Sequence, residues 1–275
     1  MVPYPDISPE IIRVGPFAVR WYGMMYLIGF ASSYLLVRHQ VKAGSETRKR
    51  VRRDREEEGV RSFKPADIDS LYSYIVLGLL LGARLGYVIF YNLSFYLEHP
   101  LEMFAVWHGG MSFHGGLIGS IAMGYLFSRK FRTDFWHTAD LVSVTAPIGL
   151  GLGRLGNFIN GELYGRVADV PWAMVFPSGG PLPRHPSQLY EFFLEGVVLF
   201  TVLWTLRRKN YETGVLTSLF VILYGAFRFF VEFFREPDVQ LGYVLGIFTM
   251  GQVLCMSMVV VGAIILYLRI AASHR

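Results

Sequence analysis

The 275-residue chain is too apolar for a typical soluble domain, because 53% of its residues are hydrophobic and only 17% are charged. A soluble protein of this length would carry about 25% charged residues. A single cysteine excludes an internal disulfide and a cysteine-based metal cluster, so we expect Cys255 to serve packing. The net charge of +5 does not indicate nucleic-acid binding, since the basic residues lie mainly between apolar runs.

Long uncharged runs predict an all-α, polytopic membrane protein. One run, Leu245–Leu268, covers 24 residues without a charged side chain, and about 20 apolar residues span a bilayer as a helix. Residues 1–16 do not have the pattern of a signal peptide, so we expect the first span to stay in the mature protein. About seven spans are predicted, at 17–37, 68–90, 110–127, 139–155, 187–206, 214–234 and 245–268.

Lysine and arginine counts orient the predicted bundle. The segments after spans one, three and five, together with the C-terminal tail, hold eighteen of these residues, against six on the other side. The positive-inside rule then predicts an external N-terminus and a cytoplasmic C-terminus.

Three segments outside the spans have distinctive compositions within a single integral membrane domain of residues 1–275. Residues 38–67 are predicted to form a charged cytoplasmic loop. Its run Arg48–Ser62 either binds anionic lipid heads or is a solvated segment that reinforces the topology. Residues 91–110 hold many aromatics and no Lys or Arg, which is typical of an arm in the membrane interface. Residues 161–186, rich in proline and glycine, predict a small external cap.

Ionisable residues inside the predicted spans or just beyond their ends are costly in lipid and indicate either function or pairing. They are Arg84, His114, Arg154, Glu162, Glu191, Glu195, Arg228, Glu232 and Arg235. Arg228, Glu232 and Arg235 follow one another at spacings of four and three residues, so a local Arg–Glu–Arg ladder explains them as well as catalysis does. Taken together, these charges predict a polar cavity.

Two of these acids, Glu191 and Glu195, lie four residues apart on one helix face, where like charges repel. They need cationic partners from other helices. Arg84 and Arg228 are the candidates.

The stretch GLGRLGNFINGELYGR (Gly151–Arg166) places Arg154, two asparagines and a glutamate at the external end of a span. Its glycines match the dinucleotide-binding pattern G-x-G-x-x-G. We reject that interpretation because the run follows a membrane helix and no βαβ unit surrounds it. The glycines instead allow close backbone approach, and Arg154 can bind a phosphate with two N–H groups. Asn157 shares a helix face with Arg154 if the helix continues.

Three further motifs carry polar residues near the external side. His114 lies in GGMSFHGGLIG (Gly109–Gly119), either as a hydrogen-bonded packing residue or as a functional one. RHPSQLYE (Arg184–Glu191) opens the fifth span, and part of it could be only a helix cap. FRFFVEFFREPD (Phe227–Asp238) ends the sixth span.

These four motifs, with RWYGMMY (Arg20–Tyr26), resemble the prolipoprotein diacylglyceryl transferase family in matching order over nearly the whole chain. The resemblance implies a seven-span enzyme of the bacterial inner membrane, with its N-terminus and active site toward the periplasm. It implies transfer of the sn-1,2-diacylglyceryl group from phosphatidylglycerol to the thiol of the lipobox cysteine in a prolipoprotein signal peptide, releasing glycerol phosphate. The implied partners are these two substrates and membrane lipids. No cofactor, metal or nucleic acid is expected.

The residues that the family pattern marks as important are Tyr22, His114, Arg154, Asn157, Glu162, Gly165, Glu191 and Arg235. Asn160 and Arg84 join them as candidate substrate-binding residues. Two features depart from the family pattern, because the segment between the signature and RHPSQLYE is shorter and the first cytoplasmic loop is longer. Neither departure touches a motif, so they affect the expected roles of loops only.

The expected chemistry assigns roles to these residues. A free thiol has a pKa of about 8.5, so a base or a positive field must favour the thiolate. His114 is the candidate general base, although it could merely hold lipid by hydrogen bonding. Arg154 and Arg235 are the candidates to stabilise charge on the departing phosphate, with Tyr22 and Asn157 orienting glycerol or phosphate oxygens.

Two other classes of protein also place charges in membrane spans. A transporter or channel would do so, but the two halves of this chain show no matching broken helices. An intramembrane protease would need a serine or paired aspartates in a span, and Asp140 stands alone.

Overall fold

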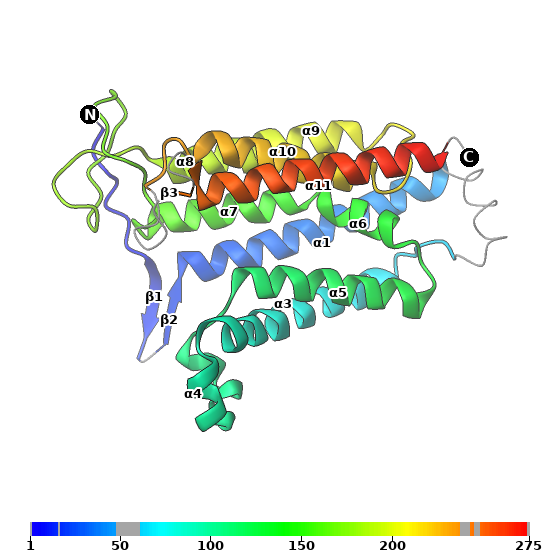
Figure 1. Cartoon of the computed structure of the whole chain (residues 1–275), viewed down its shortest axis with the longest axis horizontal. Helices are drawn as coiled ribbons and strands as arrows, with labels where there is room; N and C mark the ends of the chain where they lie inside the picture. The colour runs from blue at the N-terminus through cyan, green and yellow to red at the C-terminus, as the bar shows by residue number, and fades with distance from the viewer. Residues whose placement is uncertain (1, 16, 48–60, 237–242, 245–247, 274–275) are drawn as a thin grey trace. The chain divides into compact units, whose positions relative to one another are not determined.

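The structure is a computed structural model that describes residues 2–15, 17–47, 61–236, 243–244 and 248–273. Most of the charged run Arg48–Ser62 therefore lies outside the described residues. The chain divides into two compact units, one formed by Met1–Leu36 with Asp140–Arg275 and the other by Val37–Ala139. Both units are built mainly from helices (Figure 1).

Apolar helices make the chain a helical membrane protein. Among the described residues, three helical stretches are long and apolar enough to cross a membrane, namely Asp67–Tyr91, Ser187–Leu206 and Met250–Ala272. Val215–Val231 is apolar but shorter. All four coincide with predicted spans, while the full set of seven stays a prediction.

The first unit opens with a hairpin of β1 (Glu10–Val14) and β2 (Phe17–Arg20), paired antiparallel. Helix α1 (Trp21–Thr47) starts directly after β2 and ends in the second unit. Its last turns cover part of the segment that was predicted to be a charged loop from residue 38. The hairpin likewise replaces the predicted start of the first span at residue 17.

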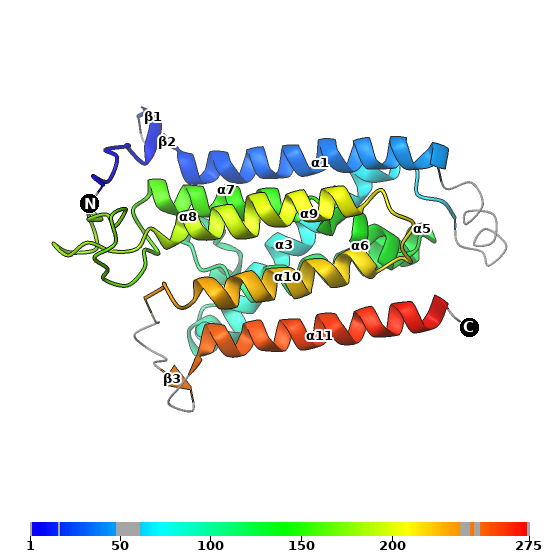
Figure 2. The same cartoon turned by 90° about the horizontal axis from the view of Figure 1, so that it is seen from above.

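The other helices of this unit are α7 (Ala146–Ile159), α8 (Ser187–Glu191), the π-helix η3 (Phe192–Val198), α9 (Leu199–Leu206), α10 (Val215–Val231) and α11 (Met250–Ser273). A short pair of strands, β3 (Tyr243–Val244) and β4 (Phe248–Thr249), precedes α11. Figure 2 shows α1, α7, the α8–α9 rod, α10 and α11 running side by side. A buried cluster joins Leu199 and Leu203 of α9 and Leu216 of α10 to Val144, which lies just before α7.

The predicted fourth span, residues 139–155, is two helices. Helix α6 (Phe135–Ser143) ends before Thr145, and α7 begins at Ala146 with Pro147 in its first turn. Proline has no N–H to donate and its ring clashes with the preceding turn, so it is tolerated at a helix start but not inside. The buried hydroxyl of Thr145 hydrogen bonds Ser33 at the break, 2.7 Å between oxygens.

Asp140 anchors the start of α10 to α6. Its Oδ2 accepts from the backbone N–H of Gly214 at 2.8 Å. Its Oδ1 accepts from the backbone N–H and the hydroxyl of Thr217, at 2.8 and 2.7 Å. The carboxylate thus satisfies backbone donors that a helix N-terminus leaves free.

In the second unit, α3 (Asp67–Tyr91) packs against α5 (Phe113–Phe131) through glycines. A Cβ on Gly82 would lie 2.8 Å from Cα of Gly119, and one on Gly86 would lie 2.8 Å from Cα of Gly115. Small residues at this spacing let two membrane helices approach backbone to backbone. The close packing of α3 against α5 therefore depends on glycine at these positions.

Residues 92–110 join α3 to α5 through short helices, α4 (Leu93–Glu98), η1 (Pro100–Phe104) and η2 (Val106–His108). Large apolar side chains remain exposed along the segment, among them Leu101 (83%), Trp107 (76%) and Phe104 (75%). In a membrane protein such side chains suit lipid or the interface.

Residues 161–186 fold onto the N-terminal segment. Phe176 is buried, with its ring 5.3 Å from Tyr164 and 5.1 Å from Tyr4. The hydroxyl of Tyr4 donates to the carbonyl of Phe158 at 2.6 Å. Isolated β-bridges of Arg184 to Val167 and Met174 hold the loop together.

Candidate active site

Glu191 lies at the centre of a buried group of charges in the first unit. Its side chain is 0% exposed, and its carboxylate meets three arginines. Oε1 accepts from Nη1 of Arg228 and from Nη1 of Arg235, the latter at 3.2 Å. Oε2 lies 3.1 Å from Nε of Arg154. The predicted partnership with Arg228 is confirmed.

Arg154 faces a second carboxylate as well. Oε2 of Glu195, also 0% exposed, lies 3.9 Å from the same Nε that meets Glu191. The side chain of Tyr224 is a further polar neighbour of Arg154. The two acids therefore occupy the Nε side of Arg154, whose side chain keeps 21% of its surface exposed.

Glu232 joins the same group from the end of α10. Its Oε2 lies 3.0 Å from Nη2 of Arg228 and 3.8 Å from Nε of Arg235, which confirms the predicted ladder. Its Oε1 accepts from the hydroxyl of Thr249 at 3.0 Å. We define the ion cluster as Arg154, Glu191, Glu195, Arg228, Glu232 and Arg235. With all six ionised, its charges balance.

Backbone contact between two glycines brings the elements of the ion cluster together. A Cβ on Gly151 would lie 2.9 Å from Cα of Gly196, and the reverse contact is equally close. Helix α7 therefore touches η3 without an intervening side chain, one turn from Arg154 and next to Glu195. The π-helix itself is unusual, since such turns are rare and occur frequently at functional sites.

Gly165 holds the end of α10 in place. It forms a β-bridge with Arg235 and donates its N–H to the carbonyl of His185 at 2.8 Å. A Cβ there would collide with the carbonyl oxygen of Phe234, so only glycine fits. The next residue, Arg166, donates from Nε to the carbonyl of Arg235 at 2.7 Å. Gly165 thus acts on the ion cluster through the backbone of Arg235.

A second polar group lies at the end of α7. Oε1 of Glu162 accepts from Nδ2 of Asn157 at 2.8 Å and from Nδ2 of Asn160 at 3.2 Å. The Tyr22 hydroxyl hydrogen bonds Tyr26 at 3.0 Å and also lies within reach of Asn157. Four residues predicted from the sequence are therefore brought together, one turn of α7 beyond Arg154.

His185 and Tyr190 form a polar pair beside Glu191. Nδ1 of His185 lies 3.0 Å from the hydroxyl of Tyr190, which accepts from the indole N–H of Trp172 at 2.6 Å. Burial lowers the pKa of His185, while the nearby Asp169 opposes the shift. The imidazole is therefore neutral at neutral pH.

His114 and Arg84 belong to the second unit. His114 is the second residue of α5 and is exposed, with its ring 5.6 Å from that of Phe113. The helix start is capped by Ser112, whose hydroxyl accepts from the N–H of Gly115 at 3.2 Å. An exposed imidazole at a helix start is free to meet a ligand, but its role as a base stays a prediction.

Arg84 has partners other than the glutamates for which it was a candidate. Its side chain is buried, and its nitrogens donate five hydrogen bonds to backbone carbonyls. The acceptors are Glu102, Met103, Ala105, Gly109 and Gly110. All five N–H groups of the guanidinium are thereby used. To contact a substrate as predicted, Arg84 would have to give up a hydrogen bond to one of these carbonyls.

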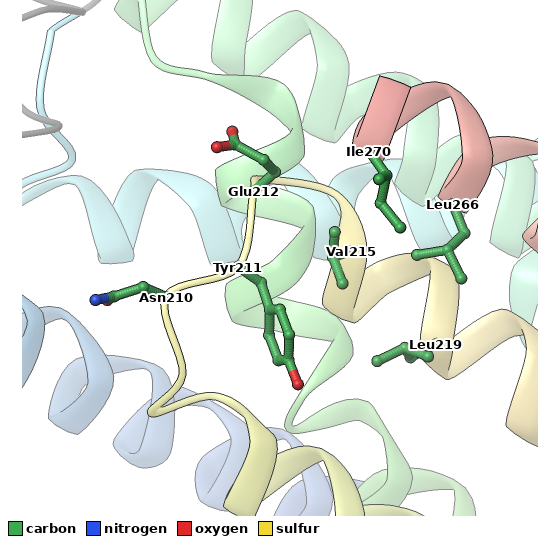
Figure 3. Close-up of a pocket in the computed structure, with 7 residues that line it drawn as sticks. All are labelled: Asn210, Tyr211, Glu212, Val215, Leu219, Leu266 and Ile270. Atoms are coloured by element: carbon green, nitrogen blue, oxygen red, sulfur yellow. The ribbon is translucent and has the colours of Figure 1, made fainter. Parts of the chain in front are cut away.

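A cavity of about 400 Å³ lies away from the ion cluster, at the other end of α10 (Figure 3). Its walls are Val215, Leu219, Leu266 and Ile270, with Asn210, Tyr211 and Glu212 from the loop before α10. Arg228 is thirteen residues beyond Val215 on α10, or roughly 20 Å at the helical rise. The cavity therefore takes no part in the chemistry of the ion cluster.

Sequence reasoning left two members of the site without a role. Glu195 was noted only as an acid in need of a partner, and Tyr224 was not singled out. The available signal was helical spacing, because Glu195 follows Glu191 by four residues and Tyr224 precedes Arg228 by four.

Comparisons with known proteins agree with the motifs. The family described as "Prolipoprotein diacylglyceryl transferase" matches residues 9–268. The phosphatidylglycerol–prolipoprotein diacylglyceryl transferase of Desulfotalea psychrophila is 49% identical, over 98% of this chain and 96% of the relative. Proteins of the same description from Bordetella parapertussis and Geobacter sulfurreducens are 52% and 51% identical, covering 96% and 94% of this chain, and 95% and 94% of the relatives.

Proposed function

The chain belongs to the prolipoprotein diacylglyceryl transferase family, and from that premise we propose how its ion cluster carries out the transfer. The enzyme moves a diacylglyceryl group from phosphatidylglycerol to a prolipoprotein, the first step of lipoprotein maturation. The acceptor in this proposal is the thiol of the lipobox cysteine in the signal peptide. The donor is an anionic phosphodiester, for which guanidinium groups are suited ligands.

The reaction forms one bond and breaks one. The sulfur of the cysteine attacks the glyceryl carbon, and the C–O bond to phosphate breaks with its electron pair on the departing oxygen. Diacylglyceryl thioether and glycerol phosphate are the products, and the thiol proton passes to a base. Negative charge grows on the phosphate as the bond breaks, so cations held against it lower the barrier.

Arg154 is the group that meets the phosphate in this proposal. Its Nε side is occupied by Glu191 and Glu195, and its 21% exposed side chain is the most accessible of the ion cluster. Its terminal nitrogens are then directed at a ligand and can bind two phosphate oxygens. Arg235, 14% exposed, supplies a second cation.

The predicted polar residues take supporting positions. Tyr22, Asn157, Asn160 and Glu162 would orient the glycerol head or the phosphate oxygens. Asn157 lies one turn beyond Arg154 on α7, and its amide donates to the Glu162 carboxylate, which Asn160 also contacts. His114 would receive the thiol proton, because a neutral imidazole accepts protons near pH 7. The exposed position of His114 at the start of α5 supports this role.

We place the enzyme in the bacterial inner membrane with seven spans, its N-terminus and ion cluster toward the periplasm and its C-terminus in the cytoplasm. The lysine and arginine count supports this orientation. Residues 161–186 form the small external cap. Residues 91–110 lie in the interface as an arm, supported by the exposed Leu101, Phe104 and Trp107.

One observation carries the proposal: three arginines converge on Glu191, and the most exposed of them, Arg154, stands in the family signature. The test combines purified protein in detergent, phosphatidylglycerol and a lipobox peptide. Mass spectrometry should find the diacylglyceryl thioether on the peptide, and none when the cysteine is replaced by serine. No adduct with the cysteine peptide across several detergents would reject the proposal.

A further inference from the structure

Among the acids of the ion cluster, Glu195 has the fewest contacts that would stabilise an ionised carboxylate. Its side chain is 0% exposed, and neither carboxyl oxygen has a hydrogen-bond partner in the described part of the chain. Its closest cation is Nε of Arg154, at 3.9 Å. Burying a carboxyl group without hydrogen bonds is costly. Such a group inside a membrane helix points to function rather than to stability.

The local backbone is built to bring Glu195 close to Arg154. Glu195 lies in the π-helix η3, where hydrogen bonds close five residues apart and the turn is wider than in an α-helix. The following residue, Gly196, touches the backbone of Gly151 on α7. A side chain at either glycine would push the two elements apart and lengthen the distance from Glu195 to Arg154.

Glu191 and Glu195, the two acids that contact Arg154, differ in their other ion-pair partners. Glu191 is shared with Arg228 and Arg235, the cations that an incoming phosphate also attracts. Glu195, in contrast, has Arg154 as its ion-pair partner among the described residues. When the lipid phosphate binds, it can replace Glu191 as the partner of Arg228 or Arg235. Glu195 still faces the Nε side of Arg154.

We propose that Glu195 is a positioning residue that fixes the Nε side of Arg154 and thereby aims its terminal N–H groups at the phosphate of the lipid. This inference rests on the proposed function. Glu195 does not touch the substrate, so it acts through Arg154 alone. Its effect therefore falls on turnover, because a small error in the aim of a guanidinium weakens its hold on the transition state.

A double-mutant cycle between Glu195 and Arg154 tests the proposal, with initial rates of thioether formation as the readout. Glu195→Gln keeps the shape and removes the charge. In the otherwise wild-type enzyme it should lower kcat about tenfold or more, with the KM for phosphatidylglycerol changed less than about twofold. In an Arg154→Lys background, the same change should lower kcat less than about twofold, because the group that Glu195 positions is gone.

Controls separate positioning from a general loss of structure. Glu236→Gln removes an exposed partner of Arg184 and should leave kcat unchanged in both backgrounds. Thermal unfolding and gel filtration in detergent establish that each variant is folded. If Glu195→Gln does not fold, Glu195→Asp replaces it in the same cycle.

Two outcomes would overturn the inference. One is an equal fold loss of kcat from the Glu195 substitution in both backgrounds, which is expected of a purely structural residue. The other is wild-type kcat in Glu195→Gln. Failure of the proposed function looks different, since the wild-type enzyme itself would then form no thioether in the same assay.

Discussion

Arg154 and Glu191 are joined by an ion pair of 3.1 Å between Nε and Oε2 that links α7 to α8. The two side chains differ in access, because Glu191 is 0% exposed and Arg154 is 21% exposed. The carboxylate therefore balances the charge of the arginine on its buried side, while part of the Arg154 side chain stays exposed. A site that binds an anion in a membrane needs this combination, since an unpaired buried cation would be unstable.

Loss of the central carboxylate should destabilise the first unit. In Glu191→Gln, three arginines lose their shared counter-charge, and breaking a buried ion pair on one side typically costs about 3–5 kcal/mol. We expect a clear drop in the thermal unfolding midpoint in detergent. Glu236→Gln, which breaks an exposed pair with Arg184, should change the midpoint little. Equal midpoints for the two variants would contradict the central position of Glu191.

The glycine contact between α3 and α5 predicts a position-specific effect of alanine. Gly82→Ala places a Cβ 2.8 Å from Cα of Gly119, so the helices must separate, and we expect lower thermal stability. Gly124→Ala is the matched control on α5, because its added Cβ would meet no described atom within 4 Å other than the neighbouring backbone of its own helix. That substitution should be neutral or stabilising by up to about 1 kcal/mol from helix propensity. Similar losses at both sites would argue against the close contact.

Asp140 should matter for stability and not for chemistry. Asp140→Ala leaves the N–H groups of Gly214 and Thr217 without an acceptor at the start of α10. Loss of a helix cap costs about 0.5–2 kcal/mol, and buried donors left unpaired add to that. We expect a lower unfolding midpoint with kcat per folded molecule near that of the wild type. A complete loss of turnover in well-folded protein would show that Asp140 has a chemical role after all.

The assignment of His114 as the base can be tested by an isosteric change. Glutamine keeps the size and hydrogen-bonding capacity of the side chain but cannot take a proton, so His114→Gln should lower kcat by about 10²–10⁴-fold. His108→Gln serves as the control, because His108 is exposed and paired with Glu102 in the connecting segment. Turnover near wild type in His114→Gln would leave hydrogen bonding to lipid as its role.

Hydropathy was sufficient to predict part of the helices, and proline chemistry explains the main difference. The apolar runs at 68–90, 187–206 and 214–234 coincide with α3, the α8–α9 rod and α10. The break inside residues 139–155 follows from Pro147. The sequence shows this proline, but it does not show that the proline lies in the first turn of a new helix. The extension of α1 past residue 37 could not be read from hydropathy, because that part of the helix is polar.

Pairing within the candidate site was predictable only where both partners lie on one helix. The Arg228–Glu232 contact followed from a spacing of four residues. The contacts of Arg154 with Glu191 and Glu195 depend on the approach of Gly151 to Gly196, which links elements some forty residues apart in the chain. Spacing carries no information on such contacts. Arg84 shows the same limit, because its acceptors are backbone carbonyls that have no signature in the sequence.

The measurement that tests the central claim most directly separates lipid binding from turnover in Arg154→Ala. Phosphatidylglycerol binding is measured in nanodiscs, and thioether formation is measured on the lipobox peptide. Because Arg154 is assigned to the charge that grows on the departing phosphate, kcat should fall by about 10²-fold or more while the lipid still binds within about tenfold of wild type. Wild-type turnover in folded Arg154→Ala would contradict the account.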